Sequence, residues 1–361
     1  MTLPLLPPHD VDLETRDTMR LCSQTHRVLG ELKGLEALLP NPAILINSIP
    51  LLEAQSSSEI ENIVTTQDQL FRAALQSDEA CNDPATKEVL QYRTALRWGC
   101  DEIQKGRPLS TNLLVEICSK IRGTHIDVRK TSVYIGNPVT KEVIYTPPEG
   151  ETVLRDLLAN WEKFLHYDAD ALDPLIKLAV SHYQFEAIHP FSDGNGRTGR
   201  IANILYLIEN KLLKYPILYL SRYIIQTKHE YFRRLREVTE NSEWESFVIY
   251  MLEGIRIIAK ETVFRIQNIC LLLENTCEKC KQSLPGIYSR ELMDLLFELP
   301  YCRTQTLINK GFGKRQTASH YLNSLENIGV LQSIKVGKEK VYLNSELIKI
   351  LSKDYSNEIE K

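Results

Sequence analysis

The stretch HPFSDGNGRTGR, residues 189–200, decides how the rest of this chain is interpreted. Its twelve residues include a histidine, an acid, an asparagine, three glycines and two arginines, a composition unsuited to a hydrophobic core. Apolar residues recur at helical spacing before it, in 172–188, and after it, in 201–212. Because Pro190 cannot continue a helix, the sequence predicts a helix, a loop, and a second helix that begins within the stretch.

The loop carries the residue types of an anion-binding site. A helix start offers unpaired N–H groups and a partial positive charge, which suits phosphate. Gly194 and Gly196 allow backbone N–H groups to turn inward without a Cβ clash. Arg197 and Arg200 fall on one helical face and can both contact phosphate oxygens. The sequence therefore predicts phosphate binding at the start of the second helix.

Asp193 and His189 add a metal ligand and a base to this site. Asp193 is a hard oxygen ligand beside the expected phosphates, where Mg²⁺ commonly sits on one or two carboxylates. His189 is the group of this loop that titrates near neutrality and could take a proton from a hydroxyl. A plain helix cap with solvated arginines and a structural histidine explains any one of these residues. It does not explain the paired arginines together with His189.

At these residues the chain resembles the Fic family of nucleotidyl transferases, whose signature is His-Pro-Phe-x-(Asp/Glu)-Gly-Asn-Gly-Arg-x-x-Arg. The resemblance implies a mostly α fold with a helical Fic core. It also implies transfer of AMP from ATP to a protein hydroxyl (AMPylation), with Mg²⁺ as the cofactor. The implied roles are His189 as the base, Asp193 as the metal ligand, and Gly194, Asn195, Gly196, Arg197 and Arg200 as the ATP-binding residues, with Arg200 on the γ-phosphate.

A second polar stretch, SSSEIENI, occupies residues 56–63. Its serines and glutamates are spaced as capping boxes, which predicts a helix start. We expect that helix to span about residues 56–75.

The same stretch has a further interpretation through the family resemblance. Many Fic proteins carry an inhibitory helix with the pattern (Ser/Thr)-x-x-x-Glu-(Gly/Asn), which Ser57, Glu61 and Asn62 match. The resemblance implies that Glu61 pairs with Arg200 and removes it from the γ-phosphate. A carboxylate at that position would also repel a triphosphate.

Two β-rich runs, 131–135 and 139–145, flank Gly136-Asn137-Pro138 and predict a hairpin. A structural ribbon is the plain interpretation. Fic proteins have such a flap above the active site, where it aligns the target by strand addition. On that resemblance we expect Ile135 and Gly136 to contact the target.

The C-terminal region predicts a winged-helix domain over residues 286–350. Residues 303–340 hold seven Lys or Arg against two Glu, although the whole chain has a net charge of −4. A basic third helix and wing suit DNA phosphates, whereas other winged helices serve as protein-contact or dimer modules, and both interpretations stay open. The expected elements are helices at 288–299, 305–309 and 314–327 and strands at 330–334 and 340–344.

The domain boundaries expected from these patterns are 1–110 for an N-terminal helical region, 111–270 for the Fic catalytic core and 286–350 for the winged helix. Of the 361 residues, 43% are hydrophobic and 25% charged, which is ordinary for a soluble globular protein. Eight scattered cysteines are typical of reduced thiols. The sequence shows no secretion signal and no long apolar run, so we expect a cytoplasmic protein without a membrane partner.

Three functions follow from these patterns. The leading one is an adenylyltransferase that its own Glu61 inhibits. The second is removal of AMP from modified protein, with Glu61 orienting a water molecule. The third is a DNA-binding regulator whose Fic core senses nucleotide. The expected partner is a protein substrate. Self-modification, for which the hydroxyl-rich Ser56–Ser58 is a candidate, and a homodimer both stay open.

Overall fold

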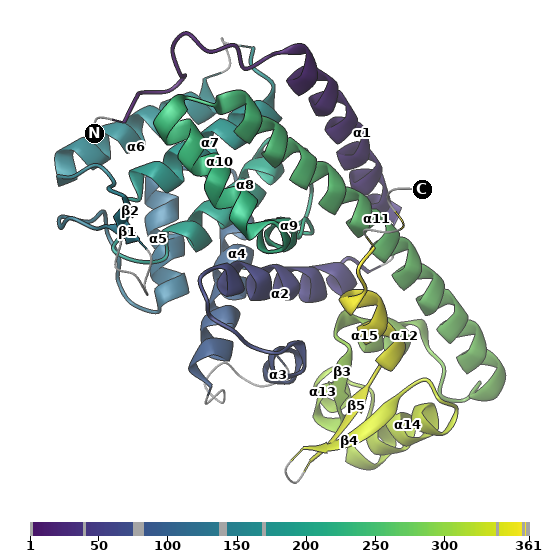
Figure 1. The fold of residues 1–361 in the computed structure, drawn as a ribbon. Coiled ribbons are helices and arrows are strands. Elements are labelled where there is room, and N and C mark those ends of the chain that lie inside the picture. Colours follow the sequence, from purple (N-terminus) through teal and green to yellow (C-terminus); the bar gives the residue numbers. More distant parts are fainter. Residues whose placement is uncertain are drawn as a thin grey trace.

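The computed structural model describes residues 3–38, 41–74, 83–136, 143–167, 171–336, 339–355 and 358. Helices make up most of it, in agreement with the mostly α prediction (Figure 1). A larger part contains the glycine-rich loop, and a smaller part at the lower right contains the C-terminal region.

Helices α7 (Pro174–Ile188) and α8 (Asn195–Glu209) form the centre of the larger part, on either side of the glycine-rich loop. Nearly every residue of these two helices is buried. Apolar residues therefore occur on all sides of each helix and not in a single stripe. Asp173 begins α7, because its carboxylate accepts a hydrogen bond from Leu175 N at 2.8 Å. The other elements of the larger part are α1 (Arg16–Leu38), α2 (Ala43–Ile60), α3 (Gln67–Ala73), α4 (Pro84–Gln104), α5 (Thr111–Arg122), β1 (Ile135–Gly136), β2 (Val143–Tyr145), α6 (Glu151–His166), α9 (Leu220–Gln226), α10 (Lys228–Asn241) and α11 (Trp244–Ser283).

The smaller part has the element order of a winged helix, as the sequence predicts. Its strands form an antiparallel sheet in the order β3-β5-β4. Strand β3 was not predicted, and the first wing strand lies two residues further along the chain than expected. The elements are α12 (Arg290–Glu298), β3 (Tyr301–Arg303), α13 (Thr304–Asn309), α14 (Arg315–Asn327), β4 (Gln332–Val336), β5 (Glu339–Leu343) and α15 (Ser345–Ser352).

The smaller part packs directly on the N-terminal helices. Helix α12 lies against α2, and the ring of Tyr301 stacks on that of Phe71 with centroids 6.0 Å apart. The Tyr301 hydroxyl also donates to Asp68 Oδ1 at 2.5 Å. Helix α11 runs from one part into the other, with α1 along its first half (Figure 1).

The prediction of a helix over 56–75 was wrong. Residues 56–60 form the last turns of α2, and α3 is a separate helix that begins after the cap Thr66. The error came from the spacing of the serines and glutamates, which fits the capping box of a helix start. Here Pro50 lies inside α2, because the helix is buried along most of its length and packs on α4 and α9. Tertiary packing therefore outweighs the lost hydrogen bond of the proline.

The predicted hairpin is present, but its strands are shorter. Ile135 pairs with Tyr145 and Gly136 pairs with Val143, with an irregularity between the two pairs. Gly136 was expected at the turn and lies instead in strand β1. Residue 131 does not join the ladder, because its carbonyl accepts a hydrogen bond from Arg129 Nη1 at 3.0 Å. The rest of the expected turn, residues 137–138, and the start of the second expected strand, residues 139–142, lie outside the described residues.

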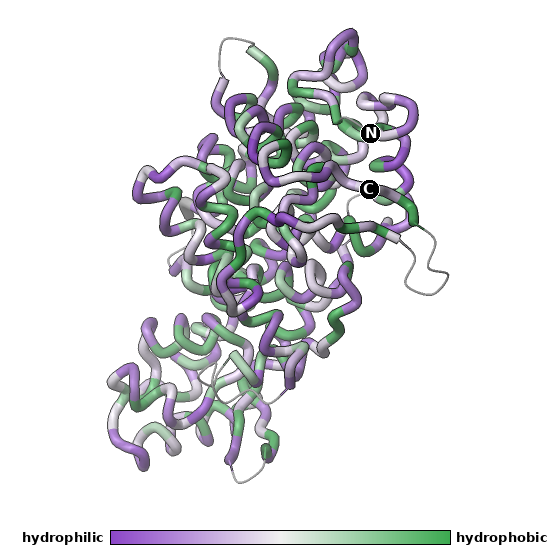
Figure 2. Tube along the Cα trace, turned by 90° about the vertical axis from the view of Figure 1, so that its left-hand side faces the viewer, coloured by the Kyte–Doolittle hydropathy of each residue, from purple (hydrophilic) through white to green (hydrophobic). Residues whose placement is uncertain are grey.

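Hydrophobic and hydrophilic residues alternate along the chain in both parts (Figure 2). Among the described helices, none combines the length and the apolar character needed to span a bilayer. The cysteines that the structure describes are free thiols, as expected.

Candidate active site

The loop between α7 and α8 begins with His189 in an unusual backbone conformation. His189 ends α7 in the left-handed region, at φ 50° and ψ 58°, and its N–H donates to Phe185 O at 3.0 Å. Few residues other than glycine adopt this conformation. It turns the chain sharply, so that the imidazole lies at the edge of the loop.

The His189 ring is prepared to accept a proton. Its Nδ1 lies 3.4 Å from the carbonyl oxygen of Glu186. Because a carbonyl only accepts, this contact places the proton on Nδ1 and leaves Nε2 as the basic nitrogen. The pKa of His189 is lowered to about 4, chiefly by burial and to a smaller extent by the charge of Arg129, although the Glu186 contact raises it. The imidazole is therefore neutral at pH 7.

The end of the loop is shaped by Gly194 and Asn195. Gly194 is the N-cap of α8 and has φ 86°, a region that favours glycine. The Asn195 carboxamide closes the loop, because Phe191 N donates to its Oδ1 at 2.7 Å and its Nδ2 donates to Phe191 O at 2.8 Å. The side chain predicted to bind phosphate thus holds the loop in shape, and the start of α8 presents the backbone N–H groups.

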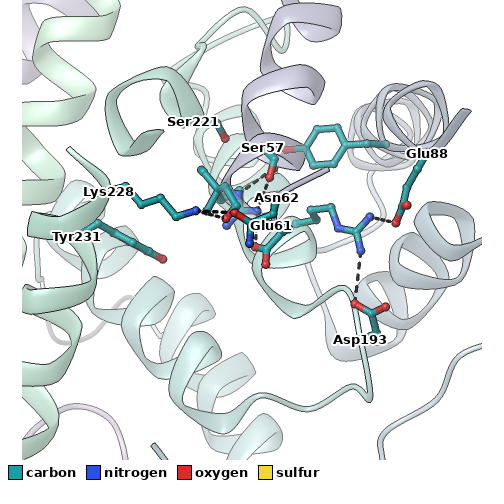
Figure 3. A network of polar contacts seen from close by, with 12 residues as sticks. Ser57, Glu61, Asn62, Glu88, Asp193, Ser221, Lys228 and Tyr231 are labelled. Carbon is teal, nitrogen blue, oxygen red and sulfur yellow. Dashed lines mark hydrogen bonds and ion pairs between the residues drawn. The ribbon is translucent and has the colours of Figure 1, made fainter. Parts of the chain in front are cut away.

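Arg197 and Asp193 belong to a network of alternating charges. Arg197 is 2% exposed and pairs with Glu88 of α4 and, at 3.5 Å, with Asp193 Oδ1. Arg122 Nη1 contacts the same two carboxylates, at 3.0 Å for Glu88 and 2.9 Å for Asp193 Oδ2. Figure 3 shows Glu88 and Asp193 facing one guanidinium group from different elements. The network fixes Arg197 at the first turn of α8.

The carboxylates of this network suit a metal that arrives with a nucleotide. Among the described residues, no group of three or more His, Cys, Asp or Glu is placed to hold a metal ion by itself. Asp193 is 53% exposed at the start of α8 and offers one carboxylate. Mg²⁺ commonly binds through one or two carboxylates and takes its remaining ligands from substrate phosphates and water. The residues present therefore fit a magnesium ion that is shared with bound phosphates.

Arg200 is held by the last turns of α2. Its Nε donates to Ser57 Oγ, and its Nη2 donates to the Ser57 carbonyl and to Glu61 Oε1, each at 2.8 Å. The Arg200 side chain is 3% exposed and that of Glu61 39%. Burial raises the pKa of Glu61, but the charge of Arg200 outweighs this effect and lowers the pKa overall. The contact predicted between these two residues is therefore an ion pair with a specific geometry.

The backbone after α2 explains why asparagine follows the glutamate. Asn62 has φ 63°, which asparagine and glycine tolerate best. Its N–H donates to Glu59 O at 2.9 Å, and Ile63 N donates to Ser58 O at 3.0 Å. These two bonds make a Schellman motif. Glu61 is thus the C-cap of α2, and the motif fixes the direction of its side chain.

Lys228, the first residue of α10, completes the end of α2. Its Nζ donates to Ile60 O at 2.7 Å and lies 3.4 Å from Asn62 Oδ1 (Figure 3). A lysine at a helix C-terminus satisfies a free carbonyl and interacts favourably with the helix dipole.

Gly196 lies where Glu61 and Arg200 meet. A Cβ at this position would collide with Glu61 Oε1 and would lie 2.9 Å from Arg200 Nη1. The glycine therefore allows the ion pair to lie directly over the first turn of α8.

The expected flap residues Ile135 and Gly136 lie in β1, near the loop. The hairpin is tied to α7, because the Tyr145 hydroxyl donates to Ala187 O at 2.9 Å. Val143 and Tyr134 are more than half exposed on this hairpin. The flap thus offers exposed apolar side chains on a hairpin that is tied to α7 two residues before His189.

Several residues of this site were not predicted from the sequence. They come from segments far from the signature, and as single polar residues in helices or turns they gave no local signal. They are Glu88, Arg122, Arg129 and Lys228.

The fold is helical, and a glycine-rich loop opens a buried helix whose first N–H groups suit an anion. Domain models described as Fic/DOC family N-terminal and Fic/DOC family match residues 19–101 and 108–207. A model described as protein adenylyltransferase SoFic-like, C-terminal domain, matches residues 272–347. The chain belongs to the Fic/DOC family.

Curated relatives are similar over the signature region. Protein adenylyltransferase fic-1 of Caenorhabditis briggsae is 30% identical over 172 residues, which are 45% of this chain and 31% of the relative. Protein adenylyltransferase Fic of Culex quinquefasciatus is 30% identical over 164 residues, or 42% and 29%. The chain therefore spans less than a third of the length of these relatives.

Solved structures are similar over more of the chain. A Fic family protein from Desulfovibrio desulfuricans G20 covers 93% of this chain and 98% of its own, with a TM-score of 0.58 and 19% identity. A fragment of Fic-1 from Caenorhabditis elegans covers 69% of this chain and 73% of its own, with a TM-score of 0.53 and 20% identity. At these identities the likeness shows the fold.

Proposed function

We propose that this protein transfers AMP from ATP to a hydroxyl side chain of a protein, with Mg²⁺, and that Glu61 inhibits the transfer by holding Arg200. The observation that carries the proposal is the Glu61–Arg200 ion pair over the first turn of α8, at 2.8 Å. The names of the curated relatives, protein adenylyltransferases, support the same activity.

The chemistry assigned to the loop is an in-line displacement at the α-phosphorus of ATP. A bond forms between the target oxygen and the α-phosphorus, the bond to the oxygen that bridges to the β-phosphorus breaks, and pyrophosphate leaves. The hydroxyl proton passes to His189 Nε2. Loop N–H groups and Arg197 would stabilise charge on the phosphates. Asp193 would hold Mg²⁺, which when bound would supply further positive charge at the phosphates.

Inhibition follows from competition for one guanidinium. In the observed state, Ser57 and Glu61 accept hydrogen bonds from Nε and Nη2 of Arg200. A γ-phosphate at this place would have to displace Glu61, whose charge repels it. ATP that does bind would then lack the contact which orients it for attack.

The test uses the purified chain with Glu61→Gly, Mg²⁺ and ATP labelled at either the α- or the γ-phosphate. Transfer of AMP places the α label on protein and leaves the γ label in solution, whereas phosphoryl transfer gives the reverse. If neither label reaches protein, even with cell lysate added as a source of targets, the proposal fails. An AMP-modified protein offered to the wild type would then test AMP removal.

Replacement of Asp193 with asparagine tests the metal site. In the Glu61→Gly chain we expect the Mg²⁺ concentration for half-maximal labelling to rise about tenfold or more, because the neutral amide is a weaker ligand. Labelling is measured across a Mg²⁺ titration. Asp156→Asn, at an exposed position of α6, is the matched control. An unchanged titration curve for the Asp193 variant would contradict its role as the metal ligand.

The C-terminal domain offers a contact surface at the start of α14, and we propose that it binds DNA or a protein there. Several basic residues of this domain are already paired, such as Lys340 with Glu326 at 2.7 Å. Lys314 and Arg315 are exposed, and no salt bridge joins either to another described residue. We further propose that the protein forms a homodimer and is located in the cytoplasm.

A further inference from the structure

Arg129 lies between the flap and the catalytic loop, and its side chain is buried although it is charged. The residue is 4% exposed. In the part of the chain that the structure describes, no carboxylate lies within ion-pair distance of it. The hydrogen-bond acceptors that Arg129 contacts are backbone carbonyl groups. The side chain donates from Nε to His189 O at 2.8 Å and from Nη1 to Thr131 O at 3.0 Å. Its Nη2 donates to Pro148 O at 2.6 Å and to Ile188 O at 3.4 Å. The backbone N–H of Arg129 donates to Pro190 O at 2.8 Å.

These carbonyls belong to two structures that must act together. Ile188 and His189 are the end of α7, where carbonyls lack helical partners and a positive charge is favourable. Thr131 and Pro148 lie just before and just after the hairpin, at its base. The planar guanidinium has donors in a fixed geometry, so it sets the separation of the two structures more strictly than a lysine would.

We propose that Arg129 is a positioning residue, which fixes the flap relative to His189 and thereby places the target hydroxyl near the base. The inference rests on the proposed function. Its physical basis is that one buried side chain holds the left-handed peptide at His189 and both ends of the flap. A target strand on β1 would take its position from the flap, and hence from Arg129.

A second contact ties the flap to α7 independently of Arg129. The Tyr145 hydroxyl donates to Ala187 O at 2.9 Å. Ala187 is two residues before His189, so this bond also connects the flap with the base. Loss of either tie should loosen the flap without removing any group that touches the nucleotide phosphates.

Arg129 has an electrostatic effect as well, which can be separated from its geometry. Its charge adds to burial in lowering the pKa of His189. Arg129→Lys keeps the positive charge but loses the planar guanidinium with its fixed donors, whereas Arg129→Gln loses both. The two variants therefore distinguish positioning from charge.

The experiment compares Arg129→Lys, Arg129→Gln and Tyr145→Phe in the Glu61→Gly chain, with Arg155→Gln as an exposed arginine control. The measurements are self-labelling from α-labelled ATP and the affinity for MgATP by calorimetry. We expect labelling to fall about tenfold or more in both Arg129 variants, because misplacement of reacting groups is costly. MgATP affinity should change less than twofold. The proposal would be overturned if labelling and MgATP affinity fell together. It would also be overturned if labelling stayed unchanged.

Two further measurements do not depend on catalysis. Hydrogen exchange at 131–136 and 143–148 should accelerate in all three variants and stay unchanged in the control. An NMR titration should give a higher His189 pKa in Arg129→Gln, with Arg129→Lys close to the parent chain. Unchanged flap exchange in folded Arg129→Gln would also overturn the proposal. Absence of label on any protein with the parent chain, even with cell lysate added, would by contrast count against the proposed function.

Discussion

Replacement of Glu61 with glycine is expected to raise labelling of protein from α-labelled ATP by about 10- to 100-fold, because a hydrogen bond to a charged group contributes about 1.5–3 kcal/mol. The lower end of the range is expected, since the Glu61 side chain is 39% exposed and solvent screens the pair. The variant frees the Nη2 group of Arg200 that now contacts Glu61 Oε1. Initial rates at equal MgATP concentrations measure the effect.

Two controls make this result specific. Glu61→Gln keeps the size of the side chain and removes its charge, so it should activate partially. Glu59→Gly changes an exposed glutamate of the same helix that does not contact Arg200, and it should leave labelling near the wild-type rate. Equal labelling by wild type and Glu61→Gly would show that the ion pair does not limit transfer.

Replacement of His189 with alanine in the Glu61→Gly chain is expected to lower labelling by about 10²- to 10⁴-fold, the usual contribution of a general base. Affinity for MgATP should stay the same, since the proposed role of His189 is at the incoming hydroxyl and not at the phosphates. His125→Ala, an exposed histidine near the flap, is the matched control. Comparable labelling with and without His189 would refute its role as the base.

The same residue predicts a pH dependence. A base must be unprotonated, and the pKa of His189 is lowered to about 4 by burial and by Arg129. Labelling in the Glu61→Gly chain should therefore be nearly constant from about pH 5.5 to 7.5 and decline towards pH 4. A decline centred on the ordinary value of 6.5 would mean that the imidazole is more solvated than its burial implies.

The sequence predicted the centre of the site because its residues are close in the chain. The helix, loop and second helix around 189–200 follow from local rules about proline, glycine and apolar spacing. The contact between Glu61 and Arg200 came from the family resemblance, since 139 residues separate them. Arg129 and Glu88 could not be predicted, because their partners are brought to them by the packing of α4, α7 and α8 and by the base of the flap.

The end of α2 was misplaced for an instructive reason. Serines and glutamates three residues apart fit a helix start, although here they lie in the last turns of α2. The decisive signal was Asn62, which fits the left-handed position after a helix and is followed by an apolar residue. Correct placement of this boundary changes Glu61 from a residue near the start of a helix into the C-cap of α2. There its charge lies at the unfavourable end of the helix dipole, opposed by Arg200 and Lys228.

Helix α11 has a consequence for how the two parts of the molecule can move. Its 40 residues make a continuous rod of about 60 Å without an internal proline. The winged helix is therefore mounted on a stiff arm and does not hang from a flexible tether. A swing of that domain has to pivot near residues 284–289 or bend the rod itself. A protein cut within the rod would expose its buried stripe at Ile269, Leu273 and Cys277, so we expect such fragments to aggregate and not to behave as independent units.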